Sequence, residues 1–306
     1  MMDTLITLTQ GLENDWVKAS IFISLASSAA ELNLLDKGGM LLDKTQAIAV
    51  GMTHRGAKAR ILLSLVSSAV ELSELTRFLE YIDQALVAVE AIRNDEAKAK
   101  TLNNLAQSAI QFNQEDKAAA ILDLARVAAI NITDSGKKSK IFEALAESVV
   151  EIESPDLATA VLDKLQAATE VINSADYQVR TLMFVAKSAA EFNQTSRVYE
   201  LIDKAQATAE GIENTGSKVK IFQNLIGSVV ELNEVGKASA LLDIAEKITD
   251  GMSLGTYKIY AYLGLAKSAA KIPDPNKIDA LFDKAIITAK GIKQAKSKAK
   301  ILQAIA

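Results

Sequence analysis

The chain repeats itself every 40 residues, and this period constrains its fold more than any other feature of the sequence. The segment KARILLSLVSSAVEL begins at Lys58, and a closely similar segment, KSKIFEALAESVVEI, begins at Lys138. A fixed period of about 20 to 50 residues is typical of a solenoid, in which each repeat contacts only its neighbours. We therefore predict a single α-solenoid domain over residues 1–306. Its seven full repeats are 18–57, 58–97, 98–137, 138–177, 178–217, 218–257 and 258–297, flanked by partial repeats at 1–17 and 298–306.

Each repeat has the pattern of two helices when its first residue is counted as column 1. Apolar or small residues recur at columns 2, 4, 5, 8, 9, 12, 13 and 15, which predicts a helix with a wide buried face. This helix, named helix A, is expected to end near column 16, which is Asn in four repeats, because Asn tolerates left-handed backbone. A second helix, named helix B, is expected over columns 19 to 35, followed by a polar loop that contains His54. The predicted fold is all-α, a right-handed superhelix of antiparallel helix pairs.

The resemblance of each repeat to a known family lies in a few columns of small and apolar residues. In the third repeat these are Leu105 and Ala106 of helix A, and Ala118, Leu122 and Ala125 of helix B. This order of helices and residues resembles the tetratricopeptide repeat, although that repeat has a period of about 34 residues and bulkier aromatic residues in helix A. The resemblance implies a scaffold that binds other proteins or peptides and carries out no catalysis.

Both ends of the sequence interrupt a repeat, and their charges are opposite. Residues 284–306 contain lysines and no acids, whereas residues 1–17 contain acids and no bases. Opposite charges flanking exposed apolar helix faces favour a head-to-tail contact between copies, which grows into a filament or tube if it does not close. The alternative is a fragment of a longer solenoid, whose missing residues cover both ends. The predicted assembly interface consists of Leu5, Leu8, Leu12, Asp15, Trp16, Lys293, Lys296, Lys300, Ile301 and Ile305.

A serine and an aspartate recur once in every repeat, at columns 11 and 26. Antiparallel packing of helices A and B places these columns at the same height, so we expect the serine hydroxyl to donate to the aspartate carboxylate. A catalytic Ser/Asp site is the alternative, but it lacks a general base, since the only histidine lies in a loop. The expected structural ladder comprises Ser28, Ser68, Ser108, Ser148, Ser188, Ser228 and Ser268 with Asp43, Asp83, Asp123, Asp163, Asp203, Asp243 and Asp283.

Basic residues recur at columns 1 and 3, at the start of helix A, where a cation opposes the helix dipole. Salt bridges to the preceding helix B would offset this, for instance between Lys98 and Glu90. The alternative is a basic surface that binds acidic peptides or proteins. The candidate peptide-binding residues are Lys98, Lys100, Lys138, Lys140, Arg180 and Lys220.

Composition narrows the remaining functional classes. The net charge is −4 and aromatic residues are few, so nucleic-acid binding is not expected. Cysteine is absent, no metal, cofactor or catalytic motif is present, and no enzymatic activity is predicted. No apolar run is long enough for a membrane span, and residues 1–20 lack the pattern of a signal sequence. The sequence leaves the compartment open: extracellular if a signal was removed, and otherwise cytoplasmic.

Overall fold

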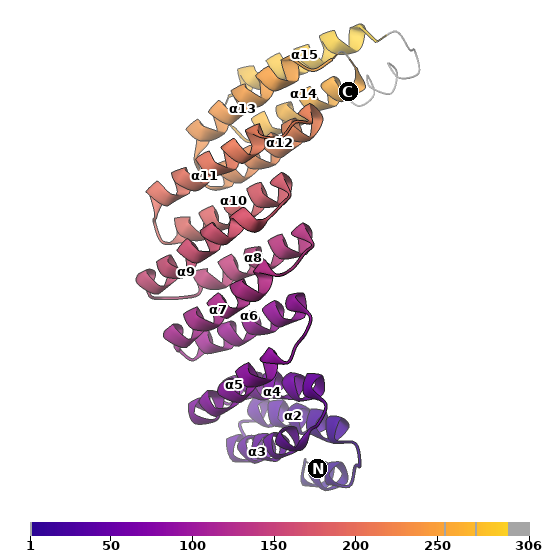
Figure 1. The fold of residues 1–306 in the computed structure, drawn as a ribbon, viewed down its shortest axis with the longest axis vertical. Coiled ribbons are helices and arrows are strands. Elements are labelled where there is room, and N and C mark those ends of the chain that lie inside the picture. The colour runs from indigo at the N-terminus through magenta and orange to yellow at the C-terminus, as the bar shows by residue number, and fades with distance from the viewer. Residues whose placement is uncertain (1, 254, 273, 293–306) are drawn as a thin grey trace. The chain divides into compact units, whose positions relative to one another are not determined.

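The computed structural model describes residues 2–253, 255–272 and 274–292, most of which are helical (Figure 1). The chain divides into two compact units, Met1–Leu165 and Gln166–Ala306, and each is described by itself. Unit 1 contains α1 (Met2–Gln10), α2 (Asp15–Glu31), α3 (Leu35–Gly51), α4 (Arg55–Glu71), α5 (Leu75–Glu90), α6 (Asp95–Gln111), α7 (Glu115–Ile130) and α8 (Ser135–Val150). The boundary falls within α9 (Pro155–Ala168). Unit 2 continues with η1 (Thr169–Val171), α10 (Ala175–Glu191), α11 (Thr195–Glu210), α12 (Thr215–Glu231), α13 (Val235–Asp250), α14 (Thr256–Ala269) and α15 (Pro275–Lys290).

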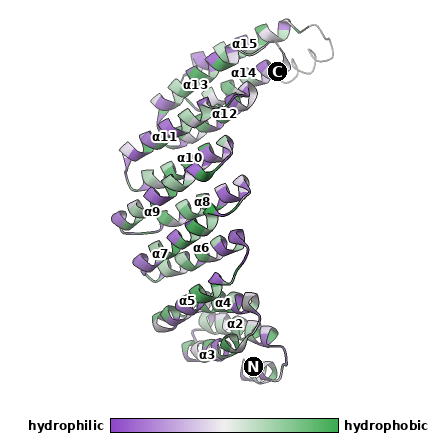
Figure 2. Ribbon diagram, in the orientation of Figure 1, coloured by the Kyte–Doolittle hydropathy of each residue, from purple (hydrophilic) through white to green (hydrophobic). Residues whose placement is uncertain are grey.

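The predicted all-α solenoid of helix pairs is confirmed. The even-numbered helices from α2 to α14 are the A helices, and the odd-numbered ones from α3 to α15 are the B helices. Each A helix of unit 1 packs against the next one, in the order α2, α4, α6, α8, and unit 2 continues the pattern with α10, α12 and α14. Apolar residues recur along every helix (Figure 2), and the A helices bury small ones such as Ala26, Ala106 and Ala186, which allows neighbouring helices to approach closely.

The turn from helix A to helix B depends on a left-handed residue at column 16, as the asparagines predict. Asn33, Asn113, Asn193 and Asn233 have φ angles of 53° to 61°, and Ser73 at the same column has 56°. The fourth repeat uses a different turn, in which Pro155 begins α9. There the Glu115 carboxylate accepts from the backbone N–H groups of residues 153 and 154, at 2.7 and 3.1 Å.

Helix A begins earlier than predicted, because the polar residues expected to form a loop are helix caps. The side chains of Asn14, Asn94, Asp134 and Asn214, all at column 37, accept from the backbone N–H three residues further on. His54 occupies the same column, and its Nδ1 accepts from the Ala57 N–H at 3.1 Å. A side-chain acceptor at this position satisfies an amide that the first helical turn leaves without a partner. His54 is therefore a capping residue of α4.

Candidate functional site

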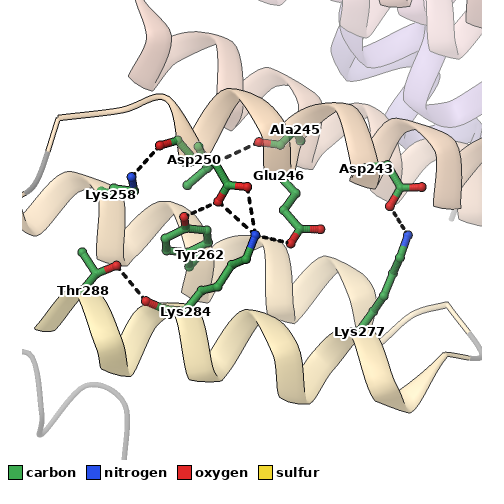
Figure 3. Close-up of polar contacts among 10 residues, drawn as sticks. Asp243, Ala245, Glu246, Asp250, Lys258, Tyr262, Lys277, Lys284 and Thr288 are labelled. Carbon is green, nitrogen blue, oxygen red and sulfur yellow. Dashed lines mark hydrogen bonds and ion pairs between the residues drawn. The ribbon is translucent and has the colours of Figure 1, made fainter.

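The aspartates of column 26 join successive B helices through ion pairs. Among the described contacts, five of these carboxylates accept from a basic side chain 34 residues further along, at column 20 of the next repeat. Asp123 instead accepts from Arg126 and Lys164, because column 20 of the fourth repeat is Leu157. Asp43 accepts two hydrogen bonds from the Arg77 guanidinium at 2.9 and 3.0 Å. The other pairs of this Asp–basic ladder are Asp3–Lys37 at 2.9 Å, Asp83–Lys117 at 2.5 Å, Asp203–Lys237 and Asp243–Lys277, the last of which is drawn in Figure 3.

Two serines of column 11 do not form the expected bond to an aspartate of column 26. Ser148 donates to Asn103 Oδ1 at 3.0 Å, and Ser268 donates to the Gly264 carbonyl at 3.2 Å, which uses the single donor of each hydroxyl. Columns give the height of a residue along its helix, but they do not say which neighbouring helix its side chain faces. The ladder lies on the surface and links successive B helices.

Two lysines of column 1 bind the end of the preceding helix B. Lys58 Nζ donates to the Val50 carbonyl at 3.1 Å, and Lys258 Nζ donates to the carbonyls of Asp250 and Met252 at 2.6 and 3.1 Å. A cation is favourable at a helix C-terminus, where the last carbonyls lack partners. This contact offsets the unfavourable placement of the lysine at the start of helix A. Column 1 is thus structural in these repeats, and Lys138 in the same column is buried.

The basic residues of column 3, in contrast, are exposed on the A helices. They are Arg60, Lys100, Lys140, Arg180 and Lys220. In unit 1, Lys100 donates to Glu96 at 2.7 Å, and Lys137 bonds the same carboxylate at 2.9 Å. The two lysines lower the pKa of Glu96 to about 2. Column 3 therefore remains a candidate ligand surface, although Lys100 already has an acidic neighbour.

A groove of about 450 Å3 crosses the A helices of unit 2, and we name it the cationic groove. Phe184 of α10 lines it, and the cationic ends of Arg180 and Lys187 lie 5.9 and 5.6 Å from the centre of the Phe184 ring. Lys187 also forms an ion pair with Glu231 of α12, and this hydrogen bond holds the pKa of Glu231 below its usual range. Lys271, just after α14, completes the wall. Two cations thus lie over the ring of Phe184, and a third lines the same groove.

A second groove, of about 640 Å3, lies between the first turns of α12 and α14, and we name it the tyrosine groove. Tyr257 and Tyr260 of α14 line one wall, Lys220 lines the other, and Met252 also contributes. Gln223 lines both grooves, so the two are adjacent halves of one surface. Its amide nitrogen donates to the Ala261 carbonyl at 3.2 Å.

A glycine makes room for this glutamine. A Cβ at Gly264 would lie 2.4 Å from the Gln223 amide nitrogen, closer than two such atoms can approach. A side chain at residue 264 would therefore displace Gln223 from its position between α12 and α14.

The two grooves carry an excess of positive charge on an acidic chain. They are lined by Arg180, Lys187, Lys220 and Lys271, against the carboxylates of Asp176 and Glu231. The chain as a whole has a net charge of −4, so the cations are concentrated locally. A concave surface of one sign concentrates ligands of the opposite sign.

A polar cluster at the other side of α14 ties the last described helices together (Figure 3). The Tyr262 hydroxyl donates to Asp250 at 2.5 Å, and Lys284 of α15 bonds both Asp250, at 2.9 Å, and Glu246, at 2.7 Å. Burial alone would raise the pKa of Asp250, but the hydrogen bonds from Tyr262 and Lys284 outweigh it and lower the pKa. These contacts join α13, α14 and α15 through two carboxylates.

Two further classes of site have no candidate in the described part of the chain. Within residues 2–253, 255–272 and 274–292, no three His, Cys, Asp or Glu side chains gather closely enough to hold a metal ion. Among the helices described there, none combines the length and the apolar character needed to cross a bilayer.

Comparison with known proteins identifies similar solved structures but no sequence family. No protein-family model matches the chain, and no curated protein matches it. A circular tandem repeat protein is 14% identical with a TM-score of 0.49, and the match covers 99% of this chain and 89% of that one. Ton1535 from Thermococcus onnurineus is 12% identical with a TM-score of 0.41, over 98% and 94% of the two chains. TPR-like repeats of a putative kinesin light chain from Podosopora anserina are 14% identical with a TM-score of 0.36, over 66% and 100%.

Similarities of this size carry no information about ligands or activity. The helix pairs described above are those of a tetratricopeptide-like α-solenoid. The chain is therefore a helical repeat scaffold.

The structure brings together some of the predicted site residues. Arg180 and Lys220 line the two grooves of unit 2, whereas Lys98, Lys100, Lys138 and Lys140 belong to unit 1. Within the predicted assembly interface, Leu5, Leu8, Leu12, Asp15 and Trp16 are exposed. Its other half, Lys293, Lys296, Lys300, Ile301 and Ile305, lies outside the described residues.

Sequence reasoning missed Phe184, Lys271, Tyr257 and Tyr260, which line the grooves. For Lys271 and Tyr260, the available signal was their departure from the repeat. Column 14 is Glu in five repeats and Lys271 in the seventh, and column 3 is basic in five repeats and Tyr260 in the seventh.

Proposed function

We propose that the protein is a non-enzymatic interaction scaffold that binds an acidic peptide segment along the A helices of unit 2. The observation that carries this proposal is the cationic groove, in which Arg180 and Lys187 lie over the ring of Phe184 and Lys271 lines the wall. A carboxylate in such a groove gains charge-assisted hydrogen bonds, and the aromatic floor excludes water from one side of the ion pair. The neighbouring tyrosine groove extends the surface, so that it accommodates several residues of an extended chain.

Lys271 gives the proposal a sharp test because of its place in the repeat. Glutamate occupies its column in other repeats, as in Glu191 and Glu231, so Lys271→Glu restores a side chain that the fold already accepts there. The matched control is Lys44→Glu on α3 of unit 1, which changes the net charge by the same amount away from the groove.

The binding of labelled glutamate-rich peptides to these variants is measured by fluorescence anisotropy. Reversal of one charge within a groove is expected to weaken binding about tenfold or more for Lys271→Glu, and to leave Lys44→Glu close to the unsubstituted protein. Equal affinities of the two variants for the peptides would contradict binding in the cationic groove. If no acidic peptide bound the unsubstituted protein, the proposed function itself would be contradicted.

A second candidate function, head-to-tail self-assembly into a filament or tube, is favoured by an apolar patch on α1 and the start of α2. Leu5, Leu8 and Trp16 are 41%, 66% and 39% exposed, and large apolar side chains gathered on a surface mark an interaction site. We propose that a second copy covers this patch and that Asp15 meets lysines of that copy.

Sedimentation over a concentration series tests this assembly. Leu8→Glu is expected to keep the protein monomeric, whereas Val87→Glu, at a similarly exposed apolar residue of α5, is not. Growth that persists in the Leu8→Glu variant, or a protein that stays monomeric without any substitution, would contradict self-assembly through this patch.

A further inference from the structure

We propose that the peptide bound along unit 2 carries an aromatic side chain next to its acidic residue, and that this ring docks between Tyr257, Tyr260 and Met252. This inference rests on the proposed function, since it names the class of peptide that the same surface selects. The cationic groove takes the carboxylate, and the tyrosine groove takes the ring.

The two tyrosines contribute little to the folded core. Tyr257 is 83% exposed and Tyr260 is 49% exposed, although they lie one helical turn apart on the same wall of a groove. Helical spacing places both rings on one side of α14, and both line the tyrosine groove. Two neighbouring aromatic rings facing water in a concave site provide a contact surface for an apolar ligand group.

Tyr260 also breaks the repeat in a way that the fold does not require. Its column holds Arg60, Lys100, Lys140, Arg180 and Lys220 in the five preceding repeats, where a basic side chain is exposed at the start of helix A. Tyr260 therefore ends a row of cations with an aromatic ring. Tyr257 stands where the preceding repeat has Ser217, at a column that also holds Tyr177. The start of α14 thus offers a ligand different chemistry from the start of α12.

The lining of the tyrosine groove favours an aromatic ring over other apolar groups. Tyrosine rings attract a third ring in edge-to-face or offset geometry, and a methionine sulfur such as that of Met252 interacts favourably with aromatic rings. Lys220 on the opposite wall supplies a cation for the face of the bound ring. Each of these three contacts is weaker with an aliphatic side chain.

Gln223 sets the two ligand groups close together. It lines both grooves, and its hydrogen bond to the Ala261 carbonyl holds it between α12 and α14. The carboxylate and the ring of the peptide therefore lie on either side of one glutamine side chain. Residues that bind on either side of a single side chain are near one another in an extended peptide, so the recognised sequence is short.

The experiment compares peptides in a Gly-Ser background that contain glutamates with phenylalanine, glutamates with alanine, or glutamines with phenylalanine. The phenylalanine is moved along the peptide to find its best distance from the glutamates. The proteins compared are the unsubstituted chain, the variant Tyr257→Ser/Tyr260→Lys, and the control Tyr199→Ser on α11, where a half-exposed tyrosine lies on a B helix. Both substitutions in the first variant introduce residues found at those columns in other repeats.

The unsubstituted protein and the Tyr199→Ser control are expected to bind the glutamate peptide about tenfold more tightly with phenylalanine than with alanine, as the burial of one ring predicts. In the Tyr257→Ser/Tyr260→Lys variant this preference disappears, while the affinity for the glutamate–alanine peptide is retained, which also shows that the variant is folded. Equal binding of the phenylalanine and alanine peptides to the unsubstituted protein would overturn the inference and leave the proposed function intact. Failure of every glutamate peptide to bind would overturn both.

Discussion

Replacement of Tyr81 with phenylalanine should stabilise the protein, which is unusual for a buried residue. Tyr81 of α5 is fully buried, and its hydroxyl has no hydrogen-bond partner among the described residues. Burial and the nearby charge of Asp43 raise the pKa of Tyr81, so the hydroxyl stays protonated. A buried, unsatisfied polar group costs about 1 to 3 kcal/mol. Tyr81→Phe removes that group and keeps the ring, so the free energy of unfolding should rise by about 1 kcal/mol or more.

Tyr262 provides a control with the same chemical change and the opposite environment. Its hydroxyl donates to the Asp250 carboxylate, which also accepts from Lys284 (Figure 3). Hydrogen bonds to charged groups contribute about 1.5 to 3 kcal/mol, so Tyr262→Phe should lower the free energy of unfolding by about 2 kcal/mol. The two substitutions should therefore differ by about 3 kcal/mol although each removes one hydroxyl.

Denaturant titration followed by circular dichroism measures both effects. Because Tyr81 lies in unit 1 and Tyr262 in unit 2, amide hydrogen exchange in α5 and α14 shows whether each change acts locally. The reasoning is refuted if Tyr81→Phe destabilises the protein. That result would mean that the Tyr81 hydroxyl donates to Asp43 and is not an unsatisfied group.

Three further predictions concern the ladder, a close contact and pH. Asp83→Asn should destabilise by about 0.5 kcal/mol as an exposed ion pair is lost, whereas Asp283→Asn, without a basic partner among the described residues, should have no effect in the same titration. Gly264→Ala should leave the free energy of unfolding nearly unchanged, because the displacement of Gln223 offsets the gain in helix propensity. In a Gln223→Ala background the same substitution should stabilise the protein by about 1 kcal/mol, and additive effects of the two substitutions would contradict the contact. The free energy of unfolding should fall as the pH drops below about 4, because carboxylates whose pKa values are lowered by folding lose their ion pairs when they are protonated. The loss should continue toward the pKa of Glu96, about 2, and a stability that stays constant over this pH range would contradict the prediction.

The periodic features of the fold could be predicted because they repeat in the sequence. Buried columns at helical spacing predicted both helices, and the asparagines at column 16 predicted a helix end that left-handed φ values confirm. The start of helix A was placed too late because Asn94 and Asp134 are polar, and a cap differs from a loop residue only in its backbone geometry.

Contacts between repeats were harder to predict than contacts within a helix. The pairing of Asp43 with Arg77 depends on how far one B helix is shifted along the next, which a single column does not reveal. A search for two columns of opposite charge at a fixed offset would have found it, since basic residues recur at column 20. The grooves were missed for a different reason: they depend on Lys271 and Tyr260, where the seventh repeat departs from the others.

The most direct test of acidic-peptide binding by unit 2 is photo-crosslinking. A glutamate-rich peptide with a photoreactive phenylalanine analogue is bound to the whole protein, irradiated, and the adducts are mapped by mass spectrometry. The proposed function and the inferred ring contact predict adducts at Met252, Tyr257 and Tyr260, and their loss in the Lys271→Glu variant. Adducts on the B helices or in unit 1, unchanged by that substitution, would contradict the account.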